Sequence, residues 1–355
     1  MQDGLVQLSF AHELAIENGR IASEEEVLLV EQVTLHNLEF TRELLRRKGL
    51  PSSGVRETLR EHCIAHLQAG TLSAAELSAL LTSLEMWGNQ RVRLVRFSDR
   101  DLGALQDRAA VVDRASEAGL GDLIDKELPL AIDDEVAPLS IRFYEQDGRR
   151  LLILIAGKVR QIWVHQPDLP DREDVDNPEI TYRPFKRETQ KVISFAEIDV
   201  DSGEGLISTK LLRTGTSYTA EFVEFYNCFE PFLRLVEGMT VDLYRAARNV
   251  YDSLSLAEVR IRNQRSLSPS GGKASFTSHS HSTDVRADTY LNQARQTLGA
   301  SAPGDYCNFN WLRNDDLYED IHVHLHGTLG EVSILGQVRE DSVRYVLQHI
   351  RQANQ

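Results

Sequence analysis

The sequence contains little cysteine and no long hydrophobic run. Its three cysteines, Cys63, Cys228 and Cys307, form no Cys-x-x-Cys pair. This spacing excludes a disulfide framework and a structural zinc knuckle, and it predicts reduced, buried thiols. The longest apolar run, 151–156, is too short to cross a bilayer. The first residues lack a basic stretch followed by an apolar one, so we expect no signal peptide and a cytoplasmic protein.

Basic residues are fewer than acidic ones. Asp and Glu outnumber Lys and Arg by 54 to 39, which gives a formal net charge of -15. This balance disfavours non-specific nucleic-acid binding, although it leaves room for a local basic groove, and it argues against an anionic membrane surface. Arginine outnumbers lysine by 32 to 7, which is typical of a GC-rich, bacterial coding sequence.

The motifs of common enzyme classes are missing as well. The chain contains no Gly-x-x-x-x-Gly-Lys-[Ser/Thr], no Gly-x-Gly-x-x-Gly after a strand and no Gly-x-Ser-x-Gly. Phosphate-cradling loops and serine-hydrolase elbows are therefore not indicated. With 41% hydrophobic and 26% charged residues over 355 positions, the composition is that of a globular protein with more than one domain.

The first third of the chain has helical patterns. Ser23 and Glu26 form a capping box, and a leucine stripe at helical spacing follows it at Leu28, Leu35, Leu38 and Leu45. Further helices are expected over 54–68, 73–88 and 98–118. The short connections predict an antiparallel helical bundle in residues 1–130.

The pattern changes to short β-branched and aromatic segments in residues 136–262. We expect strands at 139–144, 149–156, 159–164, 192–200 and 206–212, with tight turns at Asp147-Gly148 and Gly157-Lys158. From Tyr218 to Phe229, aromatic residues recur at helical spacing, which predicts a helix that packs its aromatic face on the sheet. A further helix is expected over 241–254.

The last part follows a Ser/Gly-rich stretch, 263–283, which its composition predicts to be a flexible loop. Beyond it, residues 284–355 are expected to form an α+β part. Its elements are a helix over 284–298, strands at 306–312, 319–327 and 331–338, and a last helix capped by Asp341. The sequence thus predicts an α+β fold with an N-terminal helical bundle, a central antiparallel sheet with an aromatic-faced helix, and a C-terminal α+β part.

The most suggestive chemistry is a run of alternating histidines in a predicted strand. His322, His324 and His326 should share one face of the strand, because side chains alternate across it. Histidines at i and i+2 can ligate one metal ion, and His279 and His281 could supply further ligands, as could Asp284 and Asp320. The competing interpretation is an ordinary polar face of a half-exposed strand. The sequence predicts no cofactor unless these histidines hold a divalent metal such as zinc.

Two functions remain open at this stage, and no residue is assigned as catalytic. The first is a non-enzymatic interaction or regulatory subunit of a cytosolic bacterial assembly, for which an antiviral defence system is one setting. Its partner would be another protein or a second copy of the chain. The alternative is a metal-dependent hydrolase or nuclease that uses the C-terminal histidines.

Overall fold

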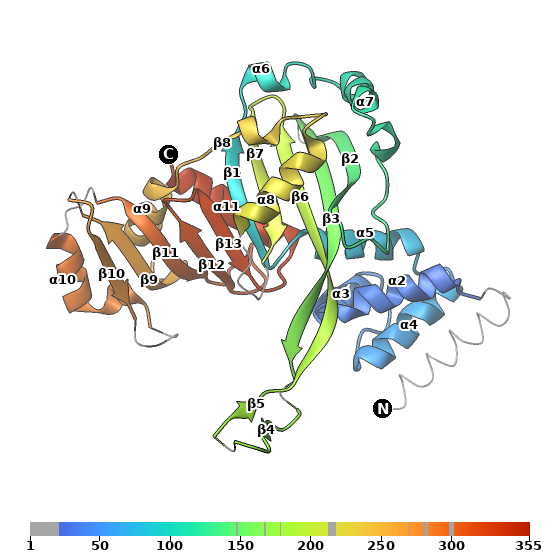
Figure 1. The fold of residues 1–355 in the computed structure, drawn as a ribbon, viewed down its shortest axis with the longest axis horizontal. Helices are drawn as coiled ribbons and strands as arrows, with labels where there is room; N and C mark the ends of the chain where they lie inside the picture. The colour runs from blue at the N-terminus through green and yellow to red at the C-terminus, as the bar shows by residue number, and fades with distance from the viewer. Residues whose placement is uncertain are drawn as a thin grey trace.

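The computed structural model describes residues 21–146, 148–166, 168–177, 179–211, 218–268, 270–278, 280, 283–297 and 302–355. Its helices and its large antiparallel sheet confirm the predicted α+β class (Figure 1). No helix within these ranges is long and apolar enough to cross a lipid bilayer.

The N-terminal helices pack on one another around their own apolar cluster, which includes Val30, Leu45, Leu59 and Leu77. They are α2 (Glu24–Leu35), α3 (Leu38–Arg47), α4 (Arg56–Gln68) and α5 (Ala74–Met86). The capping box of Ser23 with Glu26 is present at the start of α2, as predicted.

The predicted leucine stripe of the first helix is wrong. The chain breaks after Leu35, and the side chain of Asn37 caps a separate helix, α3. Leu28 and Leu35 are 41% and 67% exposed. The buried side of α2 is formed instead by Leu29, Val30 and Val33.

One antiparallel sheet of eleven strands runs through most of the molecule. Its order is β10-β9-β11-β12-β13-β1-β7-β6-β3-β2, with β8 paired to β1. The strands are β1 (Gln90–Arg96), β2 (Ala137–Gln146), β3 (Arg149–His165), β6 (Phe185–Asp199), β7 (Glu204–Lys210), β8 (Met239–Thr240), β9 (Val259–Leu267), β10 (Lys273–Thr277), β11 (Gly304–Trp311), β12 (Ile321–His326) and β13 (Glu331–Leu335).

The sequence predicts a helical bundle in residues 1–130, and the structure shows that this segment also contains strand β1. It lies between β13 and β7, with Val92 opposite Val332 on one side and Ser208 on the other. The predicted helix over 98–118 is divided into α6 (Asp99–Leu102) and α7 (Arg108–Glu117). A strand from the N-terminal segment therefore joins the central and C-terminal parts of the sheet.

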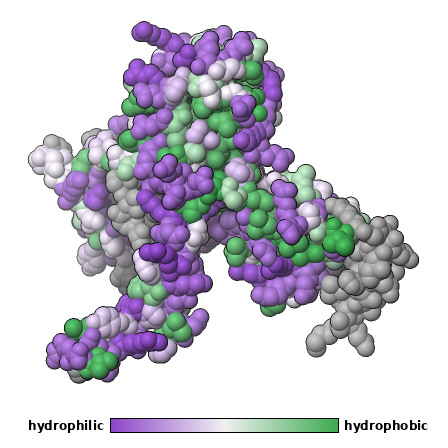
Figure 2. All heavy atoms as spheres, turned by 45° about the vertical axis from the view of Figure 1, so that its right-hand side comes forward, coloured by the Kyte–Doolittle hydropathy of each residue, from purple (hydrophilic) through white to green (hydrophobic). Residues whose placement is uncertain are grey.

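Strands β3 and β6 extend beyond the body of the molecule as a two-stranded arm, which ends in the small ribbon of β4 (Arg172–Glu173) and β5 (Thr181–Tyr182) (Figure 1). The arm is hydrophilic along much of its length and carries hydrophobic side chains near its end (Figure 2). The exposed apolar residues of the arm are Trp163, Leu169, Val175, Ile180, Tyr182 and Phe185.

The predicted turn at Gly157-Lys158 is wrong, because β3 continues through both residues. The glycine there serves close packing. A Cβ atom on Gly157 would lie 2.8 Å from the Cδ1 atoms of both Ile193 and Leu139. The hairpin tip between β6 and β7, by contrast, is where the sequence predicts it, with Gly203 at a φ of 71°.

Helices cover the two sides of the sheet in different places. On one side, α9 (Tyr244–Ser253) and α11 (Glu340–Ala353) pack against the apolar side chains of β1 and β9 to β13. On the other side, α7 and α8 (Tyr218–Phe229) cover β2, β3, β6 and β7. Phe222, Phe225 and Phe229 are buried there, which confirms the predicted aromatic-faced helix.

The sequence predicts a flexible loop over the Ser/Gly-rich stretch 263–283, but parts of this stretch form strands. Residues 263–267 belong to β9, and 273–277 form β10, which pairs with β9. The backbone hydrogen bonds of this hairpin and of β11 order a stretch whose composition alone indicates flexibility. Helix α10 (Thr289–Thr297) comes after this stretch, and the last helix, α11, comes after strands β11 to β13. Asp341 lies in the first turn of α11, and the N-cap position is taken by Arg339.

Candidate functional site

The side of β9, β11, β12, β13 and β1 that faces away from α9 and α11 forms the candidate site, which we call the polar sheet face. In Figure 1 this side is turned toward the viewer, and α8 lies on the same side over the neighbouring strands. The strand register brings its side chains into rows: Arg260, Arg262 and Arg265 from β9; Tyr306, Asn308 and Asn310 from β11; His322, His324 and His326 from β12; Glu331 and Ser333 from β13; Arg91 from β1.

The three histidines of β12 lie on one side of the strand, as their spacing predicts. Ile321, Val323 and Leu325 are fully buried on the opposite side. The ring centroids of His322 and His324 are 4.8 Å apart, and those of His324 and His326 are 6.5 Å apart. The imidazoles therefore form a contiguous row that is partly covered by its neighbours.

The environment of the row keeps these histidines neutral. Burial lowers the pKa of His322 to about 4, helped by His324 and Arg262. Burial likewise lowers the pKa of His324 and of His326 to about 4, with Arg91 contributing to both. Near pH 7 the row therefore offers uncharged rings, and the positive charge of the face comes from its arginines.

Two histidines of the row differ in their hydrogen-bond contacts. His322 Nε2 lies 2.7 Å from Asn308 Oδ1. Arg262 Nη1 lies 3.5 Å from the same nitrogen, so Nε2 of His322 is already in contact with two groups of the chain. His324 Nε2 is buried and has no hydrogen-bond partner among the described residues. That nitrogen is free to bind a group from outside the chain.

The aromatic rings on the face are associated with guanidinium groups. Tyr306 packs edge to face with His326, with ring centroids 5.0 Å apart, and Arg265 lies 5.5 Å from the Tyr306 ring centroid. Arg91 lies 4.4 Å from the ring centroid of Tyr218 at the start of α8. These pairs are flat, cationic surfaces of the kind that stack on other planar groups.

Two carboxylates balance part of this charge. Glu331 accepts from Arg91 Nε at 2.5 Å and from Arg93 Nε at 2.8 Å. Asp305 pairs with Arg265 at 2.5 Å and with Lys273 at 3.4 Å. Arg262 reaches only His322 Nε2, at 3.5 Å, and in the described part of the chain neither it nor Arg260 pairs with a carboxylate.

The face continues into a cleft of about 960 Å³ at the base of the arm. His324, His326 and Arg91 line it from the sheet, and Tyr218 lines it from α8. Ile162, Val164, Thr189 and Gln190 line it from the arm. The cleft thus combines hydrogen-bonding groups with apolar walls, as ligand sites commonly do.

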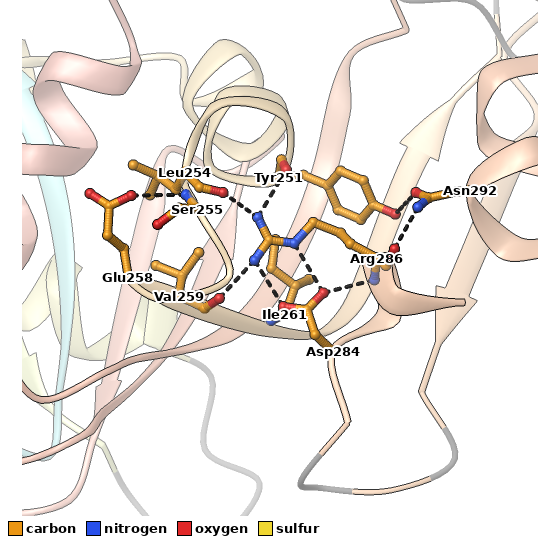
Figure 3. A network of polar contacts seen from close by, with 9 residues as sticks. All are labelled: Tyr251, Leu254, Ser255, Glu258, Val259, Ile261, Asp284, Arg286 and Asn292. Carbon is orange, nitrogen blue, oxygen red and sulfur yellow. Dashed lines mark hydrogen bonds and ion pairs between the residues drawn. The ribbon is translucent and has the colours of Figure 1, made fainter. Parts of the chain in front are cut away.

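Of the other predicted metal ligands, the structure describes two, and neither joins the row. His279 and His281 lie outside the described residues. Asp284 belongs to a structural network, in which both of its oxygens accept from Arg286 and Oδ2 also accepts from the backbone N–H of Ile261 (Figure 3). Asp320 accepts from the backbone of Arg313. Among the described residues, no group of three or more His, Cys, Asp or Glu side chains is arranged to hold a metal ion, and the metal site stays a prediction.

The sequence interpretation missed the arginines of β1 and β9. Their signal is an alternation of arginine with apolar residues, Arg91-Val92-Arg93-Leu94 and Val259-Arg260-Ile261-Arg262. This period of two predicts strands with one cationic side and one buried side. The pattern does not specify which strands pair with each other.

No protein-family model matches the chain, and no curated protein matches it either.

Proposed function

We propose that the protein is a non-enzymatic recognition component of a larger cytosolic bacterial assembly, and that the polar sheet face is its binding surface. The observation that carries this proposal is the row of arginine, histidine, asparagine and tyrosine side chains on a side of β9, β11 and β12 that helices α9 and α11 leave uncovered. A polar sheet side that opens into a cleft suits recognition of a ligand or partner.

The chemistry of the row supports binding over catalysis. A general base needs a pKa near the working pH, whereas the pKa values of His322, His324 and His326 are lowered to about 4. A divalent ion needs lone pairs and negative charge nearby. The groups around the row include Arg91, Arg262 and Arg265, and the nearby carboxylates, Glu331 and Asp305, are already paired with arginines. The arrangement is better suited to anionic groups and hydrogen-bonding partners.

The proposal is tested with tagged full-length protein recovered from its native host. Arg262→Glu reverses a charge at the β9 end of the face, and Arg100→Glu makes the same change at an exposed position on α6. We expect the wild type and Arg100→Glu to retain the same bound component and Arg262→Glu to lose it. Retention by all three proteins would contradict the proposed binding surface.

Elemental analysis of the same preparations separates the metal-dependent alternative. A hydrolase or nuclease that uses these histidines would retain about one equivalent of a divalent metal after dialysis. His324→Ala would then release the metal. We expect no stoichiometric metal in either protein, and a retained equivalent that His324→Ala loses would favour the alternative.

A further inference from the structure

We propose that the polar sheet face binds single-stranded nucleic acid, with phosphates on Arg260 and Arg262 and bases against the rings of Tyr306 and Tyr218. This inference rests on the proposed function, because it names the ligand class of the same surface. It concerns a local feature that contrasts with the net charge of -15 of the whole chain.

The first argument is the distribution of charge. Residues 259–283 contain Arg260, Arg262, Arg265 and Lys273 and no Asp or Glu. Asp305 neutralises part of this charge through Arg265 and Lys273. Arg260 and Arg262 form no ion pair within the described residues. Two guanidinium groups on one strand are therefore available to phosphate oxygens, their preferred bidentate partners.

The second argument is the presence of flat rings beside these cations. Tyr306 lies in the strand next to β9, with its ring against His324 and His326 at centroid distances of 5.7 and 5.0 Å. Proteins that bind single strands place bases on aromatic rings and guanidinium planes while arginines follow the backbone. The Arg265–Tyr306 and Arg91–Tyr218 pairs supply such surfaces at the two ends of the face.

The third argument is the size of the face and its cleft. From β9 to β1 the sheet crosses four strand spacings, about 19 Å, which is the length of a few nucleotides and fits the smaller site sizes of single-strand binders. The cleft of about 960 Å³ at the β1 end has room for a base. His324 is one of its lining residues, and its buried Nε2, which has no partner in the described part of the chain, can pair with a base edge.

The same geometry disfavours a duplex. Reading base edges in a duplex requires a helix or a two-stranded ribbon that enters a groove, and the arm, although it is a two-stranded ribbon, carries none of the proposed binding groups. Here the binding groups lie on one side of the sheet, and of them Tyr218 and His324 also line the cleft between α8 and the arm. We therefore expect single strands to bind in preference to the double-stranded form of the same sequence.

The experiment uses full-length protein and fluorescein-labelled 12-nucleotide RNA and DNA of mixed sequence, followed by fluorescence polarisation at 50 and 200 mM salt. We expect single strands to bind more weakly at the higher salt, since bound phosphates release counterions. Arg260→Ala combined with Arg262→Ala should weaken binding about tenfold or more and reduce the slope of log affinity against log salt by about two. Arg100→Ala is the matched control and should bind as the wild type does.

Three outcomes would overturn the inference: no binding of any single strand, equal binding of duplex and single strand, or equal competition by poly-glutamate of the same length. Circular dichroism of the double variant establishes that it is folded. If Arg262→Glu loses a protein partner from the host while oligonucleotides fail to bind, the proposed recognition function stands and the nucleic-acid inference fails.

Discussion

At the scale of single residues, the histidine row shows how burial and neighbouring charge decide protonation. His322, His324 and His326 are partly buried on a strand whose other side is in the core. Desolvation is the largest cause of each lowered pKa, and the neighbouring histidines and arginines add to it. Asp305 acts in the opposite direction on His326 but does not offset these effects. The three histidines are therefore neutral near pH 7 in this position.

The lowered pKa values predict that acid destabilises the folded protein. With a folded pKa of about 4 against the ordinary 6.5, each imidazole of the row binds a proton more readily in the unfolded chain. Its contribution to the free energy of unfolding is complete above pH 6.5 and is lost as the pH falls toward 4. Urea unfolding at pH 7.5 and 5 should show this loss, about 1 kcal/mol for each histidine after allowance for its partial solvent exposure.

The variant His324→Gln tests the same statement at one position. Glutamine takes up no proton, so the difference in unfolding free energy between pH 7.5 and 5 should shrink by about 1 kcal/mol. The variant is compared with the wild type at both pH values, so any packing defect cancels in that difference. An unchanged pH dependence would show that His324 titrates alike in the folded and unfolded chain.

At the scale of elements, the signals that succeeded are local in the sequence. The capping box of Ser73 with Glu76 marks the start of α5, and the aromatic spacing marks α8. Each signal is carried by residues that are close together in the sequence. Strand β1 was missed because its seven residues follow a helix directly and are specified by pairing with β7 and β13, which are far away in the sequence.

The candidate site was also predicted only as far as its signals are local in the sequence. Alternation placed His322, His324 and His326 on one side of a strand, because that signal lies within six residues. The row becomes part of a face only through β9, β1 and α8, and the cleft needs the arm as well. Such neighbours depend on strand order in the whole sheet, which no local pattern of this chain specifies.

Helix α8 is held on the sheet by a buried ion-pair group as well as by its aromatic side. Glu221 is 3% exposed and lies 3.0 Å from Lys158 Nζ and 2.8 Å from Arg160 Nη2. Both cations belong to β3. Glu224 also pairs with Lys158, but its side chain is 43% exposed. The two carboxylates thus contact one lysine from environments of very different polarity.

This contrast predicts unequal effects of the same substitution. Glu221→Gln leaves buried Lys158 with less compensating charge and should lower the free energy of unfolding by about 3 kcal/mol. Glu224→Gln removes a solvent-exposed partner of the same lysine and should cost less than about 1 kcal/mol. Chemical denaturation of both variants provides the comparison. Equal losses would show that the burial of Glu221 adds nothing to its contribution.

At the scale of the whole molecule, one sheet joins segments that the sequence separates. β1 comes from the N-terminal segment, β7 from the centre, and β13 from near the C-terminus, yet they stand side by side. Val92 and Leu94 of β1 are buried in the apolar cluster that also contains residues of α9 and α11. The helices α2 to α5 keep a separate apolar cluster, but the strand that follows them belongs to the core of the sheet.

This arrangement predicts that residues 131–355 do not fold alone. Without β1, the backbone groups of β7 and β13 that now pair with it lose their partners, and the apolar cluster loses Val92 and Leu94. We expect the fragment to be insoluble or to unfold without a cooperative transition in thermal circular dichroism. Co-expression with residues 1–130 should restore a soluble complex, because the missing strand can be supplied without a covalent link. A soluble 131–355 fragment that unfolds cooperatively by itself would show instead that the pairing of β1 adds little to a core that is already complete.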